Sequence, residues 1–260
     1  MTAAPPTLFV SLFAYAAHKH CECLGRSWAE WLTFWRENPA TCPWRGFRTL
    51  GHARALGGET VLDYVNGSTL ITKARSRAAG IFLASSADVW LTIDDDIEAS
   101  ADVVHRLILA ARETRGVVSA PCVLRSGSAM NYVLRDEETS PSAAGMLAHA
   151  SRTGLGLAAM HRAAVEAAAR RRSAPWVLGD DGVRYPALFR EKLMPIAGPE
   201  SIGLEAWVSE DYAFSDLVLA TGGRVDLLLD APTDHAGRPA KVARDLTPCV
   251  FVAPKKEKLP

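Results

Sequence analysis

Short apolar runs alternate along this chain with longer stretches in which apolar residues recur every three or four positions. The apolar runs predict buried strands at 8–13, 89–93, 117–120 and 225–229. The stretches with helical periodicity predict amphipathic helices at 27–38, 68–84, 100–115 and 157–172, with another from 209 onward. Strands that alternate with helices predict a single-domain α/β sandwich, in which helices flank a central, mostly parallel mixed sheet.

Three segments lack a clear period. Residues 39–58 and 173–207 are irregular and contain many Pro and Gly residues, so loops are expected there, with a short strand within 39–58 as an open alternative. Residues 125–150 are rich in Ser, Gly, Glu and Ala, which indicates a long mobile segment, either a lid or a disordered loop, with a hairpin around Tyr132 as an open alternative. Nothing in the pattern marks an internal repeat or a boundary to a second domain.

The charges of the 260-residue chain balance, with 29 Lys and Arg residues against 29 Asp and Glu residues. This balance gives no overall attraction to nucleic acid or to an anionic membrane, although a local basic patch is compatible with it. The N-terminal residues lack the features of a signal peptide, and no apolar run has the length of an integral membrane segment. The five cysteines form no disulfide framework, so we expect a cytoplasmic protein.

Three consecutive acids, Asp94, Asp95 and Asp96, directly follow the predicted strand at 89–93. Ligands of open α/β sheets bind at the carboxyl ends of the strands, which is where these carboxylates are expected. Adjacent acids repel one another, and a hard divalent cation is their usual compensation. Residues at i and i+2 share one side, which favours Asp94 and Asp96 as a metal pair. The alternative is a solvated acidic turn.

A second acidic group, Ser209-Glu210-Asp211, opens the last predicted helix. Ser209 is a good N-cap, and acids in the first helical turn suit the helix dipole, which by itself explains the group. The functional alternative is that one of the two acids is a general base. His235 follows the last predicted strand, and a neutral imidazole suits a transition metal such as Mn²⁺.

Two further patterns are less specific. The segment Thr-Gly-Leu-Gly at 153–156 precedes a predicted helix, where backbone N–H groups can approach a ligand closely. It lacks the third glycine of a dinucleotide site and the Lys-Ser/Thr of a P-loop. Four potential zinc ligands are crowded together without a Cys-x-x-Cys pair, and whether they bind a metal is left open: His18, His20, Cys21 and Cys23.

Taken in order, these pieces resemble the GT-A-fold, sugar-nucleotide-dependent glycosyltransferases, in particular the compact family-2-like enzymes common in bacteria and their phages. The pieces are a first strand ending in Ala14-Tyr15, a helix with Lys73-Ala74-Arg75, and the motifs DVWLTIDDDI, TGLGLAAMHR, SEDYAF, GGRV and DHAG. The resemblance implies a catalytic domain at 1–240, with a nucleotide-binding half at 1–120 and an acceptor-side half at 121–240. A C-terminal strand and basic tail at 241–260 would follow.

The resemblance also implies roles for single residues. Asp94 and Asp96 match the DxD motif, and together with His235 they are expected to hold Mn²⁺ or Mg²⁺. Asp211 matches the general base of inverting members, with Glu210 as the fallback. Contacts to the nucleotide or donor are expected from Ser11, Tyr15, Arg75, Asp94 and Asp95. Contacts to the donor sugar or acceptor are expected from Thr153 and Gly154.

These roles describe a metal-dependent transferase that moves a hexosyl or pentosyl group from a nucleoside-diphosphate sugar to an acceptor hydroxyl. The ion stabilises charge on the leaving diphosphate, while Asp211 deprotonates the attacking hydroxyl. The acceptor is left open between a saccharide, a glycoconjugate and a hydroxymethylated base in phage DNA. If the protein is encoded by a phage, it is expected in the cytoplasm of the host. The DNA option needs a basic face, for which the candidates are Arg170 to Arg172, Arg184, Arg190 and Lys192.

Two other classes stay open. A sugar-1-phosphate nucleotidyltransferase shares the general architecture, but the residues after the first strand, A-Y-A-A-H-K-H, lack its Gly-rich basic signature. A non-catalytic nucleotide- or carbohydrate-binding module is disfavoured because Asp94, Asp96, Asp211 and His235 are all present.

Overall fold

The computed structural model describes residues 8–14, 47–49, 60–66, 71–94, 96–122, 131–171, 173–179, 182, 184–196, 205–235 and 238–239. Its helices are α2 (Ile71–Ala84), α3 (Ala101–Thr114), α4 (Arg162–Ala169) and α5 (Glu210–Leu219). The strands of the largest sheet are β1 (Leu8–Ala14), β2 (Phe47–Thr49), β3 (Thr60–Asn66), β4 (Val89–Asp94), β6 (Val117–Ser119), β7 (Tyr132–Ser142), β8 (Gly145–Thr153), β9 (Leu157–His161) and β14 (Val225–Leu228). Smaller sheets contain β5 (Ile97–Glu98), β10 (Trp176–Leu178), β11 (Arg184–Pro186), β12 (Lys192–Pro195), β13 (Glu205–Val208), β15 (Asp234–His235) and β16 (Arg238–Pro239).

The largest sheet has nine strands in the order β2-β3-β1-β4-β9-β6-β14-β8-β7. The strands β2, β3, β1 and β4 are parallel neighbours, and β6 is parallel to β14. Strand β9 lies antiparallel between β4 and β6, and β8 is antiparallel to both β14 and β7. In the part of the chain that the structure describes, only β9 and β8 therefore oppose the common strand direction. The predicted mixed, mostly parallel sheet is confirmed.

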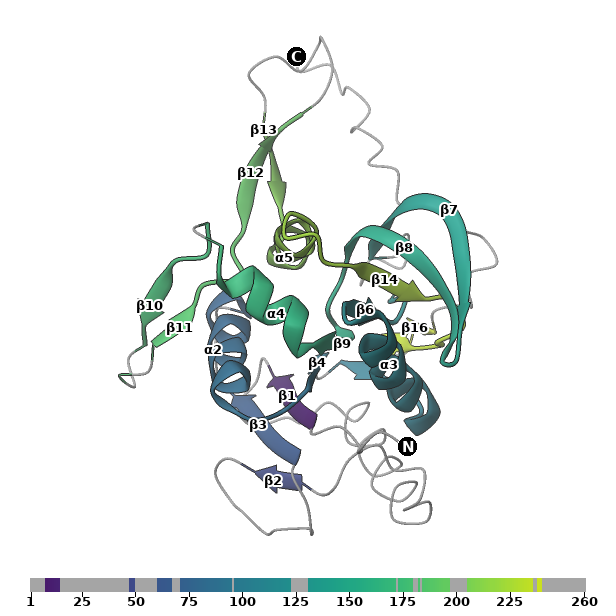
Figure 1. Ribbon diagram of the computed structural model, residues 1–260, viewed down its shortest axis with the longest axis horizontal. Coiled ribbons are helices and arrows are strands. Elements are labelled where there is room, and N and C mark those ends of the chain that lie inside the picture. Colours follow the sequence, from purple (N-terminus) through teal and green to yellow (C-terminus); the bar gives the residue numbers. More distant parts are fainter. Residues whose placement is uncertain are drawn as a thin grey trace.

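Helices cover both faces of this sheet (Figure 1). Residues 89–93 of β4 are all buried, and their side chains alternate between the two faces of the sheet because successive side chains of a strand point in opposite directions. Val89, Leu91 and Ile93 pack in one apolar cluster with α3, whereas Trp90 packs in a second cluster with α2, α4 and α5. The two clusters share their strands, so the molecule is the α/β sandwich that the sequence predicts.

Helix α3 begins and ends close to the predicted positions. Ser100 is its N-cap, and the Ser100 hydroxyl accepts a hydrogen bond from the Val103 N–H at 3.3 Å. The residue in the left-handed conformation at its end is Arg115, with a φ of 54°. Gly116 is needed for space, because a Cβ there would lie 2.5 Å from the Arg224 carbonyl oxygen.

The helix predicted at 157–172 is wrong in its first part, where the structure has β9 in the middle of the sheet. Only Arg162–Ala169 is helical. Alanine has a high helix propensity, but the backbone of β9 pairs with β4 and β6, and this tertiary pairing outweighs the local preference. The Thr-Gly-Leu-Gly segment therefore precedes a strand.

The segment predicted to be mobile contains a long hairpin instead. Strands β7 and β8 pair throughout most of 132–153, with Tyr132 opposite Thr153 at one end and Ser142 opposite Gly145 at the other. The expectation of an irregular loop is therefore wrong for these residues, whose many polar side chains hide the strand pattern, and the hairpin left open as an alternative is confirmed, with its turn at 143–144 and not at Tyr132. The irregular region at 173–207 likewise contains two antiparallel ribbons, β10 with β11 and β12 with β13. Strand β3 is not predicted from the sequence.

Several predictions concern residues outside the described ones. These are the helix at 27–38, the candidate zinc ligands, Tyr15, Asp95 and the C-terminal segment 241–260. The division of the chain near residue 120 stays a prediction. Within the described residues, no helix combines the length and hydropathy that crossing a membrane requires.

Candidate active site

Four charged side chains from three elements meet at the carboxyl end of β4. Arg75 of α2 donates through Nη2 to both carboxylate oxygens of Asp94, at 2.9 Å each. The Arg75 Nη1 donates to Glu210 Oε1 at 3.0 Å and to Asp211 Oδ1. Arg75 is only 2% exposed, so carboxylates enclose its guanidinium group. One buried cation thus joins the end of β4 to the first turn of α5.

Helices α2 and α5 bring these groups together because both pack on the same face of the sheet. Ala78 anchors α2 in the apolar cluster there, and Phe214 anchors α5. Ser209 caps α5 as predicted, since its hydroxyl accepts from the Tyr212 N–H at 3.5 Å. Arg75 is buried where these two helices meet the end of β4. Burial of its charge is tolerated because three carboxylates pair with it.

Burial and charge oppose each other in this cluster. Burial by itself lowers the pKa of Arg75, but Asp211, Asp94 and Glu210 outweigh this effect and raise that pKa. Burial raises the pKa of Asp94, and Arg75 opposes the rise. Burial also raises the pKa of Asp211 to about 6, a rise that Arg75 limits and Glu210 reinforces. A carboxylate with that pKa can accept a proton near neutral pH.

The Thr-Gly-Leu-Gly segment at 153–156, between β8 and β9, borders the acids through its backbone. The Leu155 N–H donates to Asp211 Oδ2 at 3.2 Å. The Gly156 carbonyl accepts from the Asp94 N–H at 2.8 Å. A Cβ on Gly156 would lie 3.3 Å from Ile97 Cγ1 and 3.6 Å from Asp94 Oδ2, so the backbone approaches the site closely. The segment therefore orients two of the four charged residues.

The candidate metal ligands are not equivalent. Both oxygens of Asp94 accept hydrogen bonds from Arg75, so a metal ion at Asp94 would share this carboxylate with the guanidinium group. Strand β15 pairs with β5, and this pairing puts the His235 backbone opposite Ile97, next to Asp96. Carboxylate and imidazole are ligand types that suit a divalent ion such as Mn²⁺, and the pairing brings the backbones of these two residues close together. Among the described side chains, which do not include that of His235, no three His, Cys, Asp or Glu residues are grouped to hold an ion.

Other candidate contacts are engaged within the protein. Ser11 is fully buried in β1, where its hydroxyl accepts a hydrogen bond from Trp90 Nε1 at 2.7 Å. Thr153 is also fully buried, and its hydroxyl donates to the Gly154 carbonyl at 3.3 Å. The Thr153 N–H donates to Ser215 Oγ at 3.3 Å, which ties the end of β8 to α5. In this arrangement these groups support the site from within the core.

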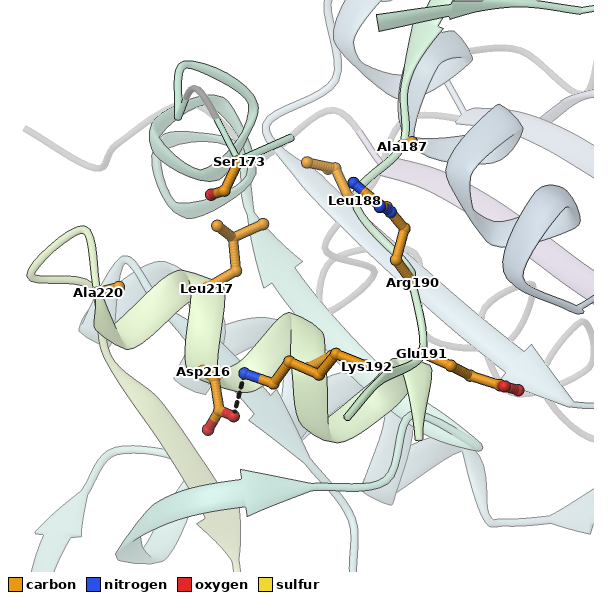
Figure 2. A pocket seen from close by; sticks show the side chains of 10 residues that line it. Ser173, Ala187, Leu188, Arg190, Glu191, Lys192, Asp216, Leu217 and Ala220 are labelled. Atoms are coloured by element: carbon orange, nitrogen blue, oxygen red, sulfur yellow. Dashed lines mark ion pairs between the residues drawn. The ribbon is translucent and has the colours of Figure 1, made fainter. Parts of the chain in front are cut away.

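A separate hollow of about 330 Å³ lies beside α5 (Figure 2). Its lining from α5 consists of Ala213, Asp216, Leu217 and Ala220. By helical periodicity these residues are on the side of α5 opposite Asp211, so the body of the helix separates the hollow from the acid cluster. Figure 2 also shows Lys192 reaching Asp216, with 2.8 Å between Nζ and Oδ2. This pairing weakens Lys192 as a candidate for a DNA-binding face.

Comparison with solved structures bears on the fold. The crystal structure of GalNAc-T7 with UDP, GalNAc and Mn²⁺ aligns with a TM-score of 0.52 and 10% sequence identity, covering 90% of this chain and 44% of that chain. This chain has the GT-A-type fold of glycosyltransferases. It spans less than half the length of the GalNAc-T7 chain.

Two other solved structures align less closely. A197 from STIV has a TM-score of 0.46 and 15% identity, with 88% of this chain and 85% of that chain covered. S. aureus TarS 1–349 has a TM-score of 0.44 and 12% identity, with 86% and 58% covered. No family model and no curated protein matches the chain.

Sequence reasoning misses the central position of Arg75 and the backbone contribution of Leu155. One signal for Arg75 is present in the sequence. Arg75 is four residues after Ile71 and three before Ala78, so it falls on the apolar stripe of its helix, where a charge needs a buried partner. No local signal marks Leu155, because the contribution comes from its backbone.

Proposed function

We propose that this protein is a glycosyltransferase that moves a sugar from a nucleoside-diphosphate sugar to an acceptor hydroxyl. The observation that carries the proposal is the convergence of Asp94, Glu210 and Asp211 on Arg75 at the carboxyl end of β4. Ligands of α/β sheets bind at this edge. The GalNAc-T7 structure, which has the same fold, was determined with UDP, GalNAc and Mn²⁺, a set that supports this substrate class.

Asp211 is the proposed general base of an inverting transfer. The Leu155 N–H and Arg75 orient its carboxylate, and a pKa of about 6 leaves it ionised at neutral pH but still basic. The acceptor proton passes to Asp211 as the acceptor oxygen bonds to the anomeric carbon. The bond from that carbon to the diphosphate oxygen breaks, and the nucleoside diphosphate leaves. Glu210, beside it, is the fallback base and raises the pKa of Asp211.

Asp96 and His235 are the proposed ligands of a Mn²⁺ or Mg²⁺ ion. Such an ion, when bound, supplies a Lewis acid to the leaving diphosphate. Asp94, although part of the DxD motif, is assigned to orienting Arg75 and the donor. Tyr15 and Asp95 remain proposed donor contacts. The acceptor remains a saccharide, a glycoconjugate or a modified DNA base.

The test is an assay of nucleoside-diphosphate sugars for hydrolysis and transfer, with Mn²⁺ and with a chelator. Asp211→Asn is expected to lower the rate by about 10²–10⁴-fold, because the base is lost. Asp96→Ala and chelation are both expected to remove metal-dependent turnover. Asp216→Asn is the matched control, since it makes the same change on the opposite side of the same helix and is expected to retain activity.

Turnover that needs no divalent ion and survives Asp96→Ala would contradict the metal assignment. If Asp211→Asn has no effect while Glu210→Gln abolishes turnover, the base is Glu210. If turnover is present but none of these acids matters, the site assignment is wrong, and if no nucleoside-diphosphate sugar is turned over at all, the transferase proposal itself is wrong.

A further inference from the structure

Two antiparallel ribbons, β10 with β11 and β12 with β13, carry apolar side chains into solvent. Neither ribbon belongs to the main sheet, and both project from the layer that contains α2, α4 and α5 (Figure 1). In the described part of the chain, the large exposed apolar side chains other than Met146 all belong to these ribbons or adjoin them: Trp176, Leu178, Leu193, Ile196 and Trp207.

Each ribbon presents a tryptophan together with a leucine. Trp176 and Leu178 are on the same side of β10 and are 51% and 71% exposed. Leu193 and Trp207 are directly opposite each other in the second ribbon and are 47% and 70% exposed. Each ribbon also has a buried side chain, Tyr185 of β11 against α2 in the first and Val208 of β13 in the second. The outward apolar sides are not needed for the fold, and such patches mark binding surfaces.

Arginines accompany the first ribbon. A hollow of about 570 Å³ near its start is lined by Arg170, Arg171 and Trp176, with Glu166 as a further lining residue. Glu166 Oε2 is 3.7 Å from Arg170 Nη1, so the hollow has two guanidinium groups for one carboxylate. Arg170, Arg171 and Arg184 of β11 are all exposed. This surface suits a ligand that has an apolar group at one end and a phosphate group at the other.

We propose that the two ribbons dock this protein on a phospholipid bilayer. The tryptophans lie at the level of the headgroups, the leucines and Ile196 enter the acyl boundary, and Arg170 and Arg171 face lipid phosphates. Tryptophan suits this interface because its ring is apolar and its indole N–H is polar. Exposed leucine and isoleucine distinguish the surface from a nucleic-acid site, which uses stacking and cations. The proposal is independent of the proposed transferase activity.

The partner is a bilayer and not a second copy of the chain because the apolar groups form two separate projections. An interface between copies is usually one continuous, complementary patch with an apolar core. Two projecting ribbons with apolar outer sides instead match insertion at more than one point. The basic hollow adds attraction to anionic lipid, which is expected to be modest because Glu191 and Glu205 are also exposed nearby.

The test is co-sedimentation of the full chain with vesicles of phosphatidylcholine, with and without phosphatidylglycerol, and without any nucleotide sugar. The protein is expected to bind both, and the anionic vesicles more tightly. Trp176→Ala combined with Trp207→Ala is expected to lower the partition coefficient about tenfold or more. Met146→Ala is the matched control, because Met146 is exposed but lies on the β7–β8 hairpin. Arg170→Glu with Arg171→Glu is expected to remove only the preference for anionic vesicles.

Three results overturn the proposal: no binding of the wild type to either vesicle, unchanged binding after loss of both tryptophans, or an equal loss in Met146→Ala. A dimer that forms without vesicles and dissociates in the tryptophan variant assigns the ribbons to self-association, and salt-sensitive duplex binding without vesicle binding assigns them to nucleic acid. Both would overturn it as well. Circular dichroism and the unfolding midpoint check that each variant is folded. Retained sugar transfer with lost vesicle binding separates this proposal from the enzymatic one.

Discussion

At the scale of single residues, the properties of the acid cluster depend on Arg75. Its guanidinium contacts Asp94, Glu210 and Asp211, so their negative charges are only partly compensated. Removing one partner of a buried ion pair lowers the free energy of unfolding more than replacing both partners does, because the remaining charge stays buried without its counter-charge. The pKa of Asp211 is therefore set by its neighbours as well as by its burial.

We expect kcat/KM for sugar transfer to rise with pH through about 6, since Asp211 must lose its proton to act as a base. Glu210→Gln removes the negative charge that helps to raise the pKa of Asp211, so the rising limb should move to lower pH. Initial rates across the pH range measure this shift. Asp216→Asn should leave the limb in place, and a limb that Glu210→Gln does not move would contradict the coupling.

The same pKa has a consequence for stability. Its folded value of about 6 lies above the unfolded value of about 3.9, so the folded state binds more protons between these two values. The contribution of Asp211 to the free energy of unfolding is therefore largest at low pH and declines as pH rises through this window. The ionised carboxylate is stabilised in its buried position by Arg75 and by the Leu155 N–H.

At the scale of elements, helix α2 positions Arg75 and also supports the first ribbon. The contact is close at Gly80, where a Cβ would lie 2.4 Å from Tyr185 Cβ and 3.2 Å from Tyr185 Cα. The nearest atoms belong to the backbone of β11 or adjoin it, so they cannot move aside as a flexible side chain could. Glycine at position 80 therefore lowers the helix propensity of α2, but it permits α2 to pack closely against β11.

Gly80→Ala is expected to destabilise the protein. Alanine gains about 1 kcal/mol in helix propensity, but overpacking against Tyr185 costs about 1–3 kcal/mol and also disturbs α2. Urea unfolding should show a lower midpoint. The control is Glu113→Ala, at an exposed position of α3, for which a change within about 0.5 kcal/mol is expected. A higher midpoint for Gly80→Ala would show that β11 can move away.

At the scale of the whole molecule, one sheet carries both apolar clusters. Strand β6 from the predicted nucleotide half lies between β9 and β14, which come from the predicted acceptor half. Neither half can unfold without breaking the backbone pairing of the other. The molecule is therefore expected to unfold cooperatively.

Leu107→Ala and Phe214→Ala test this expectation, one on each side of the sheet. Both should lower the midpoint of a single transition, by about 2–5 kcal/mol for the leucine and about 3–5 kcal/mol for the phenylalanine. Tryptophan fluorescence and far-UV circular dichroism should give coincident curves. Two resolved transitions, each sensitive to only one of the variants, would show that the halves unfold separately.

The features that could be predicted from the sequence are those that depend on neighbouring residues. The apolar run before Asp94, the cap at Ser209 and the period of α3 are local, because each arises from residues within a few positions of one another. Only the tertiary structure decided the pairing of β9, the hairpin of β7 with β8, and the partners of Arg75. Arg75 and Asp211 are 136 residues apart, and their contact exists only because α2 and α5 pack on the same face of the sheet. Local patterns carry no information about such pairings, since these depend on which distant surfaces are buried together.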